Sequence, residues 1–155
     1  MKILAVQSRM GIGDTVIFLP FIKALSKKFN SPISILVKEN SKANQYLHQT
    51  KYIDKILTLE RDNKTNNRHG GFFGIFKLAN DLKKYKFDKI FIFNSSLRFN
   101  LVAKISGIPQ IYQYPLFAKN KQHIIEAPKN FLKKNLDLDI NEDPEVQIDS
   151  NCLLY

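Results

Sequence analysis

The sequence predicts a doubly wound α/β fold, in which a parallel sheet carries helices on both faces. Three observations lead to this prediction. The chain opens with a strand, a glycine turn and a long apolar helix. Strand and helix patterns then alternate about five times, which is typical of a parallel sheet with helical crossovers. The strands are continuous apolar runs rather than alternating ones, as expected where both faces are covered.

Composition and length indicate one soluble globular domain. The 155 residues are 44% hydrophobic and 25% charged, and a chain of this length can bury a core. The single cysteine, Cys152, excludes an internal disulfide framework and a cysteine-based zinc site. The apolar runs are too short to cross a bilayer, and no signal-peptide pattern follows Lys2, so we expect a cytoplasmic protein.

The opening unit contains the residues on which the functional prediction depends. Residues 2–6 form the first predicted strand, residues 7–13 a loop, and residues 15–29 a helix interrupted by Pro20. Asp14 stands directly before this predicted helix, where an aspartate commonly acts as the N-cap.

The remaining elements follow from apolar β-rich runs and from helical spacing. The predicted strands are residues 32–38, 53–59, 87–94, 110–114 and 145–148. The predicted helices are residues 39–49, 72–85, 97–106 and 124–136, with Asn94-Ser95-Ser96 as a cap for the third of them. We interpret the large apolar helix residues as core packing rather than as a lipid or sugar platform; they are Phe18, Phe21, Leu25, Phe72, Phe73 and Phe76.

The charge is unevenly distributed along the chain. Residues 1–134 contain all 24 lysines and arginines but only 8 of the 14 acids, whereas residues 135–155 contain the other 6 acids. A basic body suggests a polyanionic partner, although lysine-rich solvated helix faces would give the same charge. Nucleic-acid binding would rest on charge alone, because the sequence contains no nucleic-acid-reading motif, and we do not expect it.

The glycine turn does not fit a dinucleotide. Gly11-Ile12-Gly13 would begin G-x-G-x-x-G, but Val16 occupies the third glycine position. Asp14 would also repel a phosphate held at the helix N-terminus. A carboxylate at this edge of the sheet can instead accept a proton from a bound hydroxyl, which is compatible with a capping role. The three histidines, His48, His69 and His123, are predicted to be surface residues away from any carboxylate cluster.

Several motifs together resemble glycosyltransferase family 9, the lipopolysaccharide heptosyltransferases. They are the opening strand with Gly13-Asp14 and the proline-interrupted helix after it, residues 85–98 with Ser106-Gly107-Ile108-Pro109, and His123-Ile124-Ile125-Glu126. The order and spacing of these motifs carry the resemblance, which covers most of residues 1–150.

The resemblance implies a Rossmann-like domain that forms the N-terminal, acceptor-binding half of a GT-B fold. Residues 1–150 would be this domain and residues 151–155 the start of a linker to an absent donor-binding domain. The implied reaction is metal-independent, inverting transfer of a heptose-like sugar from a nucleotide-sugar to a lipopolysaccharide core acceptor. The chain alone would then be inactive and would bind no cofactor, because the nucleotide-sugar belongs to the second domain.

The resemblance also assigns roles to individual residues. Asp14 would be the catalytic base. Ser8, Arg9, Gly13, Arg61 and Arg98 would bind an anionic glycolipid acceptor, with Arg68 as a further candidate, and the protein would contact the inner membrane surface peripherally. The alternative that the residues leave open is a non-catalytic Rossmann-like module that binds an anion or a protein partner.

Overall fold

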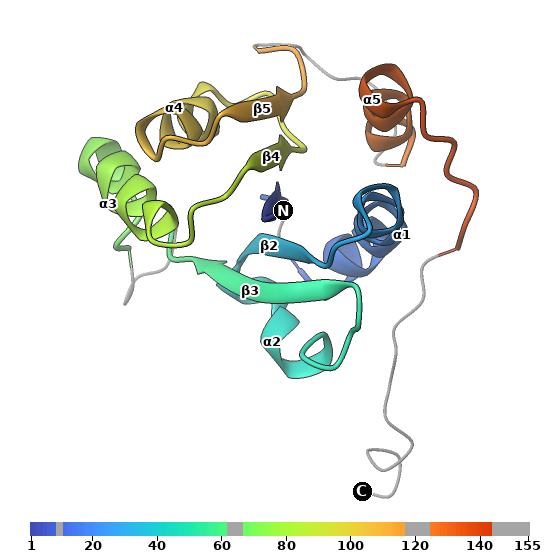
Figure 1. Ribbon diagram of the computed structural model, residues 1–155. Coiled ribbons are helices and arrows are strands. Elements are labelled where there is room, and N and C mark those ends of the chain that lie inside the picture. Colours follow the sequence, from blue (N-terminus) through green and yellow to red (C-terminus); the bar gives the residue numbers. More distant parts are fainter. Residues whose placement is uncertain (9–10, 62–66, 117–124, 144–155) are drawn as a thin grey trace, which may run out of the picture.

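The computed structural model describes residues 1–8, 11–61, 67–116 and 125–143. Five parallel strands form one sheet in the order β3-β2-β1-β4-β5 (Figure 1). The central strand β1 pairs with β2 on one side and β4 on the other, so that Ala5 lies between Ile35 and Phe91. The strands are β1 (Ile3–Val6), β2 (Ile33–Lys38), β3 (Ile53–Leu59), β4 (Lys89–Ile92) and β5 (Gln110–Gln113).

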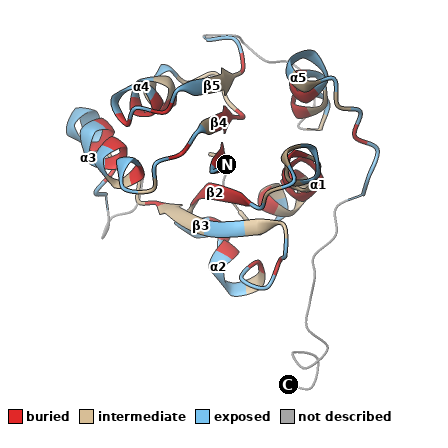
Figure 2. Ribbon diagram, in the orientation of Figure 1, coloured by how far each residue is buried: buried red, intermediate tan, exposed pale blue. Residues whose placement is uncertain are grey.

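Helices cover both faces of this sheet, as the sequence predicts. Helices α1 (Ile12–Phe29), α2 (Ala43–Tyr46) and α5 (Glu126–Leu136) contribute to the core on one face. Helices α3 (Gly71–Lys83) and α4 (Leu97–Ile105) cover the other, and a 3₁₀ turn, η1 (Glu39–Ser41), follows β2. Figure 2 shows buried residues on the strands and on the helix sides that face them. The doubly wound α/β prediction is therefore confirmed.

The first helix begins three residues earlier than the sequence suggests. The helix starts at Ile12 and continues through Pro20 to Phe29, and Gly11 is its N-cap residue. Gly11 has φ 100° and ψ 162°, a conformation that is essentially restricted to glycine. Asp14 therefore lies inside the first turn of α1, and the prediction that it is the N-cap is wrong.

Aromatic rings fix α1 and α5 against the end of β4. Phe93 directly follows β4, and its ring meets those of Phe18, Phe131 and Tyr114 edge-on at centroid distances of 5.3, 5.4 and 6.2 Å. Edge-to-face pairs at such distances stabilise a core beyond the area they bury. This cluster positions the segment after β4, which forms part of the candidate site.

The core prediction is confirmed for α1 and wrong for α3. Phe18, Phe21 and Leu25 are buried, but the α3 side chains Phe72 and Phe73 are 69% and 75% exposed. The buried face of α3 consists instead of Gly74, Ile75, Leu78, Ala79 and Leu82. The predicted strand 145–148, the domain boundary at residue 150 and Cys152 lie outside the described residues.

Candidate functional site

The strand order places a ligand site at the carboxyl ends of β1 and β4. The chain proceeds from β1 to β2 and β3 on one side of the sheet and then crosses to β4 on the other. Ligands of open α/β sheets bind outside the strand ends at this point of reversal. The loop with Ser8 leaves β1 here, and Asn94 lies just after β4.

A hydrogen-bonded wall of polar side chains spans this point. Asn94 Nδ2 donates to Ser8 Oγ at 3.0 Å, and Asn94 Oδ1 accepts from the Ser96 backbone N–H at 3.0 Å. Gln113, at the end of β5, donates to the carbonyls of Asn94 and Ser96 at 3.1 and 2.8 Å and accepts from Asn100 at 2.9 Å. Side chains held in this way present fixed donors and acceptors to a polar ligand.

Sequence reasoning found Ser8 but not the residues that hold it. Asn94 is predicted only as part of a helix cap, and Gln113 only as a residue of a short strand. Their signal was a polar side chain at the carboxyl end of a strand. Such a signal points to a site only once the strand order is known.

Asp14 presents a half-buried carboxylate in the first turn of α1, directly after the loop that carries Ser8. A carboxylate at this position interacts favourably with the N-terminal end of the helix dipole. Its Oδ2 lies 3.9 Å from where a Cβ on Gly11 would stand. The next residue, Thr15, donates its hydroxyl to the carbonyl of Gly11 at 3.2 Å and so ties the turn to the helix.

Gly13 is exposed, and a Cβ built on it meets no atom within 4 Å. We predict that Gly13→Ala leaves the free energy of unfolding unchanged or raises it by up to about 1 kcal/mol, because glycine is unfavourable within a helix. If a ligand approaches this turn, the added methyl group should weaken its binding.

Urea unfolding and ligand titration of the same variant separate these two effects. Gly11→Ala is the matched control, because its backbone conformation should cost about 1–3 kcal/mol of stability. A Gly13→Ala variant that is destabilised as strongly would contradict the prediction.

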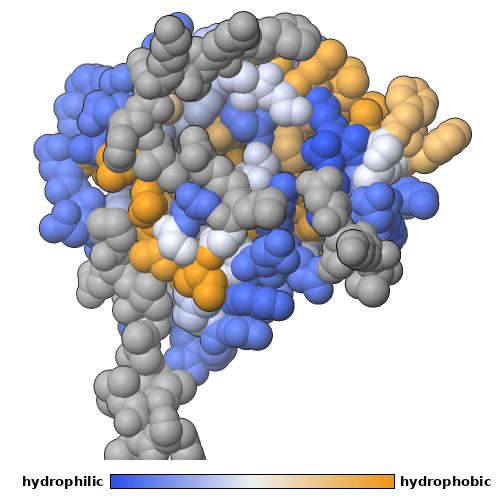
Figure 3. Space-filling model, turned by 180° about the vertical axis from the view of Figure 1, so that it is seen from behind, coloured by the Kyte–Doolittle hydropathy of each residue, from blue (hydrophilic) through white to orange (hydrophobic). Residues whose placement is uncertain are grey.

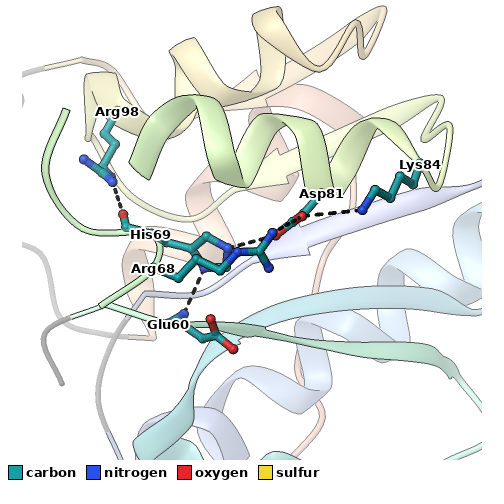
Figure 4. Close-up of polar contacts among 6 residues, drawn as sticks. All are labelled: Glu60, Arg68, His69, Asp81, Lys84 and Arg98. Atoms are coloured by element: carbon teal, nitrogen blue, oxygen red, sulfur yellow. Dashed lines mark hydrogen bonds and ion pairs between the residues drawn. The ribbon is translucent and has the colours of Figure 1, made fainter. Parts of the chain in front are cut away.

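The predicted acceptor-binding arginines have different surroundings. Arg98 donates to the carbonyl of Gly71 at 2.8 Å and also to that of His69, so its guanidinium joins α4 to the start of α3 (Figure 4). Arg61 lies two residues beyond β3 and is half-buried. Arg9 lies outside the described residues. Their contacts with an acceptor stay predictions.

His69 is buried at 3% exposure, so the prediction of a surface histidine is wrong. Its Nδ1 accepts the backbone N–H of Glu60 at 3.0 Å. Because this nitrogen is an acceptor, the ring proton is on Nε2, which donates to Asp81 Oδ2 at 3.0 Å. Arg68 donates to the other carboxylate oxygen at 2.8 Å (Figure 4). The cluster connects the segment after β3 to α3.

The Asp81 carboxylate gives this connection a defined pH dependence. Burial alone would raise the pKa of Asp81, but the hydrogen bonds from His69 and Arg68 outweigh it and hold the pKa below its ordinary value of 3.8. A lowered pKa in the folded state stabilises the protein above pH 3.8, and this contribution is lost as the pH falls below it.

Asp81→Asn should therefore lower the free energy of unfolding by about 1–2 kcal/mol at pH 7, since it weakens hydrogen bonds to a charged group. The difference from wild type should shrink as the pH is lowered below 3.8. Urea unfolding at neutral and acidic pH measures both effects, with the exposed Asp143→Asn as the control. A difference that is independent of pH would contradict the role of the carboxylate charge.

An open cleft of about 320 Å³ lies between β3 and α3 and is lined in part by Glu60, His69, Asp81 and Tyr85. It does not include Asp14. Because His69 and Asp81 are already bonded to each other and to neighbouring groups, we assign this cleft no chemistry.

Within the described part of the chain, no three His, Cys, Asp or Glu side chains gather as metal ligands do. In the same residues, no helix combines the length and apolar character needed to cross a membrane.

Comparison with known proteins identifies the fold. No protein family model matches the chain, and no curated protein matches it in sequence. Among solved structures it resembles a family 9 glycosyltransferase from Veillonella parvula DSM 2008, with a TM-score of 0.73 and 19% identity over 97% of this chain and 46% of that one.

Two Escherichia coli structures have the same fold over a similar span. ADP-heptose LPS heptosyltransferase II gives a TM-score of 0.67 and 15% identity over 97% of this chain and 48% of that one. Heptosyltransferase WaaC with ADP-2-deoxy-2-fluoro heptose gives a TM-score of 0.58 and 12% identity over 92% of this chain and 50% of that one. The chain spans about half the length of these structures, and it has the fold of one half of a GT-B glycosyltransferase.

Proposed function

We propose that this chain is the acceptor-binding half of an inverting, metal-independent glycosyltransferase. The enzyme would move a heptose-like sugar from a nucleotide-sugar to a lipopolysaccharide core-type acceptor. One observation carries the proposal: the Asp14 carboxylate lies in the first turn of α1, at the end of the sheet where Asn94 holds Ser8 across the point of strand reversal.

The proposed reaction is a single displacement with Asp14 as the base. A carboxylate oxygen of Asp14 takes the proton of the acceptor hydroxyl, and the hydroxyl oxygen attacks the anomeric carbon of the donor sugar. The bond from that carbon to the nucleotide diphosphate breaks, and the bonding electrons leave with the diphosphate. Attack on the face opposite the leaving group inverts the anomeric centre.

The basic body of the chain supports an anionic acceptor. All lysines and arginines lie within residues 1–134, so a phosphorylated glycolipid would be attracted to this part of the protein. Ser8 and Gly13 would contact the sugar at the strand ends. Arg9, Arg61 and Arg98 would pair with phosphate or carboxylate groups, for which the guanidinium fork is suited.

The rest of the reaction requires a second domain. The nucleotide-sugar would bind there, so this half would need no cofactor of its own. The natural acceptor would be anchored by its lipid, and the protein would therefore work in peripheral contact with a membrane.

Titration of the purified chain with a deacylated, phosphorylated core oligosaccharide tests the acceptor role. We expect binding that weakens with salt, exceeds that of the dephosphorylated oligosaccharide, and is reduced by Asn94→Ala, which releases Ser8. Ser31→Ala, before β2 at the opposite end of the sheet, is the matched control. Equal affinity for the two oligosaccharides would contradict an anionic acceptor site. Binding without transfer, even with a donor domain supplied, would favour a non-catalytic module.

A further inference from the structure

The outward faces of α3 and α4 form a surface that the core does not use. On α3, Phe72, Phe73 and Phe76 are 69%, 75% and 47% exposed, and on α4, Leu97, Leu101 and Ile105 are each about 40% exposed. The two helices pack against each other. Figure 3 shows hydrophobic side chains protruding at the upper right, on the side of the molecule where these helices lie. We call these six residues the α3–α4 patch.

The rings of the patch pack on one another instead of on the protein interior. Phe72 meets Phe73 and Phe76 edge-on at centroid distances of 5.9 and 5.5 Å. The inward face of α3 is already filled by other side chains. Exposed apolar patches of this kind mark interaction sites, because leaving them in water is unfavourable.

Charge indicates what covers the patch. Lys77 and Lys83 of α3 and Lys104 of α4 are exposed, and among the described residues no ion pair includes them. Asp81 is the one acidic residue in the two helices, and it is bound to Arg68 and His69.

On the opposite face of the sheet, acids near the end of the described chain pair with several of the lysines. Glu142 pairs with Lys23 and Lys27, and Asp137 and Asp139 pair with Lys133. The α3–α4 surface combines apolar side chains with three lysines that form no ion pair with any residue that the structure describes. This combination is typical of surfaces that lie on anionic lipid.

The position of the patch relative to the site fits a membrane-bound acceptor. Phe72 and Phe73 lie in the first turn of α3 and Leu97 in the first turn of α4. Both helices begin after the carboxyl ends of strands, at the same end of the sheet as Ser8 and Asn94. A glycolipid anchored in a membrane under this surface would present its sugars to that end of the sheet.

We propose that the α3–α4 patch, together with Lys77, Lys83 and Lys104, docks the protein on an anionic lipid surface. The inference rests on the proposed function for the identity of the acceptor, whereas the docking itself requires only the vesicle and this chain.

Vesicle flotation of the full chain tests the docking. Vesicles of phosphatidylethanolamine and phosphatidylglycerol, without acceptor, should bind the protein, and vesicles of phosphatidylcholine alone should bind it much less. Phe72→Ser with Phe73→Ser should lower binding by about tenfold or more, because two exposed rings no longer enter the interface. Phe72→Trp with Phe73→Trp should retain it. The free energy of unfolding of each variant, measured in urea, should remain close to that of the wild type, because both side chains are exposed.

Two double lysine variants distinguish binding through this surface from binding through the overall positive charge of the chain. Lys77→Gln with Lys104→Gln should lower binding to the anionic vesicles by about tenfold or more. Lys28→Gln with Lys134→Gln removes the same charge from α1 and α5, and should lower it only slightly. Equal losses from the two pairs, or absence of vesicle binding by the wild type, would overturn the proposal. So would a dimer in sedimentation velocity that the phenylalanine variants dissociate, because the patch would then bind a second copy.

Failure of docking and failure of the proposed function give different results. With a donor domain supplied, transfer to a soluble deacylated acceptor should not respond to the phenylalanine variants, whereas transfer to an acceptor embedded in vesicles should fall. Docking without transfer to either acceptor would refute only the proposed function, and transfer without docking would refute only the membrane surface.

Discussion

Asp14→Asn is expected to lower the rate of sugar transfer by about 10²–10⁴-fold, the contribution typical of a general base. The measurement is the transfer rate of the chain completed with a donor domain, at saturating acceptor. The amide keeps the shape of the carboxylate but cannot take the hydroxyl proton at neutral pH. Acceptor affinity should change little, since the same substitution leaves Ser8 and Asn94 in place.

The stability of the Asp14→Asn variant distinguishes catalysis from a helix-end effect. Loss of the charge in the first turn of α1 should cost only about 0.3–1 kcal/mol. Asp54→Asn is the matched control, because it makes the same change on β3 near the amino end of that strand. If Asp14→Asn transfers sugar at a near wild-type rate, Asp14 is not the base, and its charge only stabilises the N-terminal end of the helix.

Phe93→Ala is expected to lower the free energy of unfolding by about 3–5 kcal/mol, the usual cost of deleting a buried phenylalanine ring. Phe93 is 6% exposed and forms ring pairs with Phe18, Phe131 and Tyr114. Its loss would leave a cavity between α1, α5 and the end of β4. A loss of this size is a large fraction of the stability of a typical domain, and equilibrium urea unfolding measures it.

The matched control is Phe73→Ala, which makes the same change in a ring that is 75% exposed. Its effect on stability should lie within about 0.5 kcal/mol, as for other surface substitutions. If the two substitutions destabilise the protein equally, the aromatic cluster does not hold α5 in place. Because Phe93 directly precedes Asn94, its replacement should also weaken acceptor binding more than Phe73→Ala does.

The sequence predicted the sheet well because the strands are continuous apolar runs between helical segments. It misplaced the start of α1 because the residue before this helix is Gly11, which makes no side-chain cap, while a typical capping residue, Asp14, stands three residues later. The actual start depends on the backbone conformation of Gly11, which the residue type permits but does not specify.

Helical spacing also could not determine which face of α3 is buried. Phe72, Phe73 and Phe76 are the larger apolar residues, yet the helix turns Gly74 inward, where a Cβ would clash with the His69 main chain. This close approach lets Arg98 and His69 join the helix to its neighbours. Periodicity gives the width of an apolar face, whereas the space left by neighbouring elements decides which part of it is covered.

The sequence by itself determined the alternation of strands and helices, the two-sided cover of the sheet and the position of Asp14 beside a glycine turn, because these depend on local residue patterns. The tertiary structure alone decided that Asn94 bonds Ser8 and Gln113 bonds Asn94, that His69 is a buried partner of Asp81, and that three phenylalanines face outward. Each of these depends on which strands and helices become neighbours. Hydrogen bonds between residues distant in the sequence, and the exposure of a side chain on a helix, are determined only by that packing.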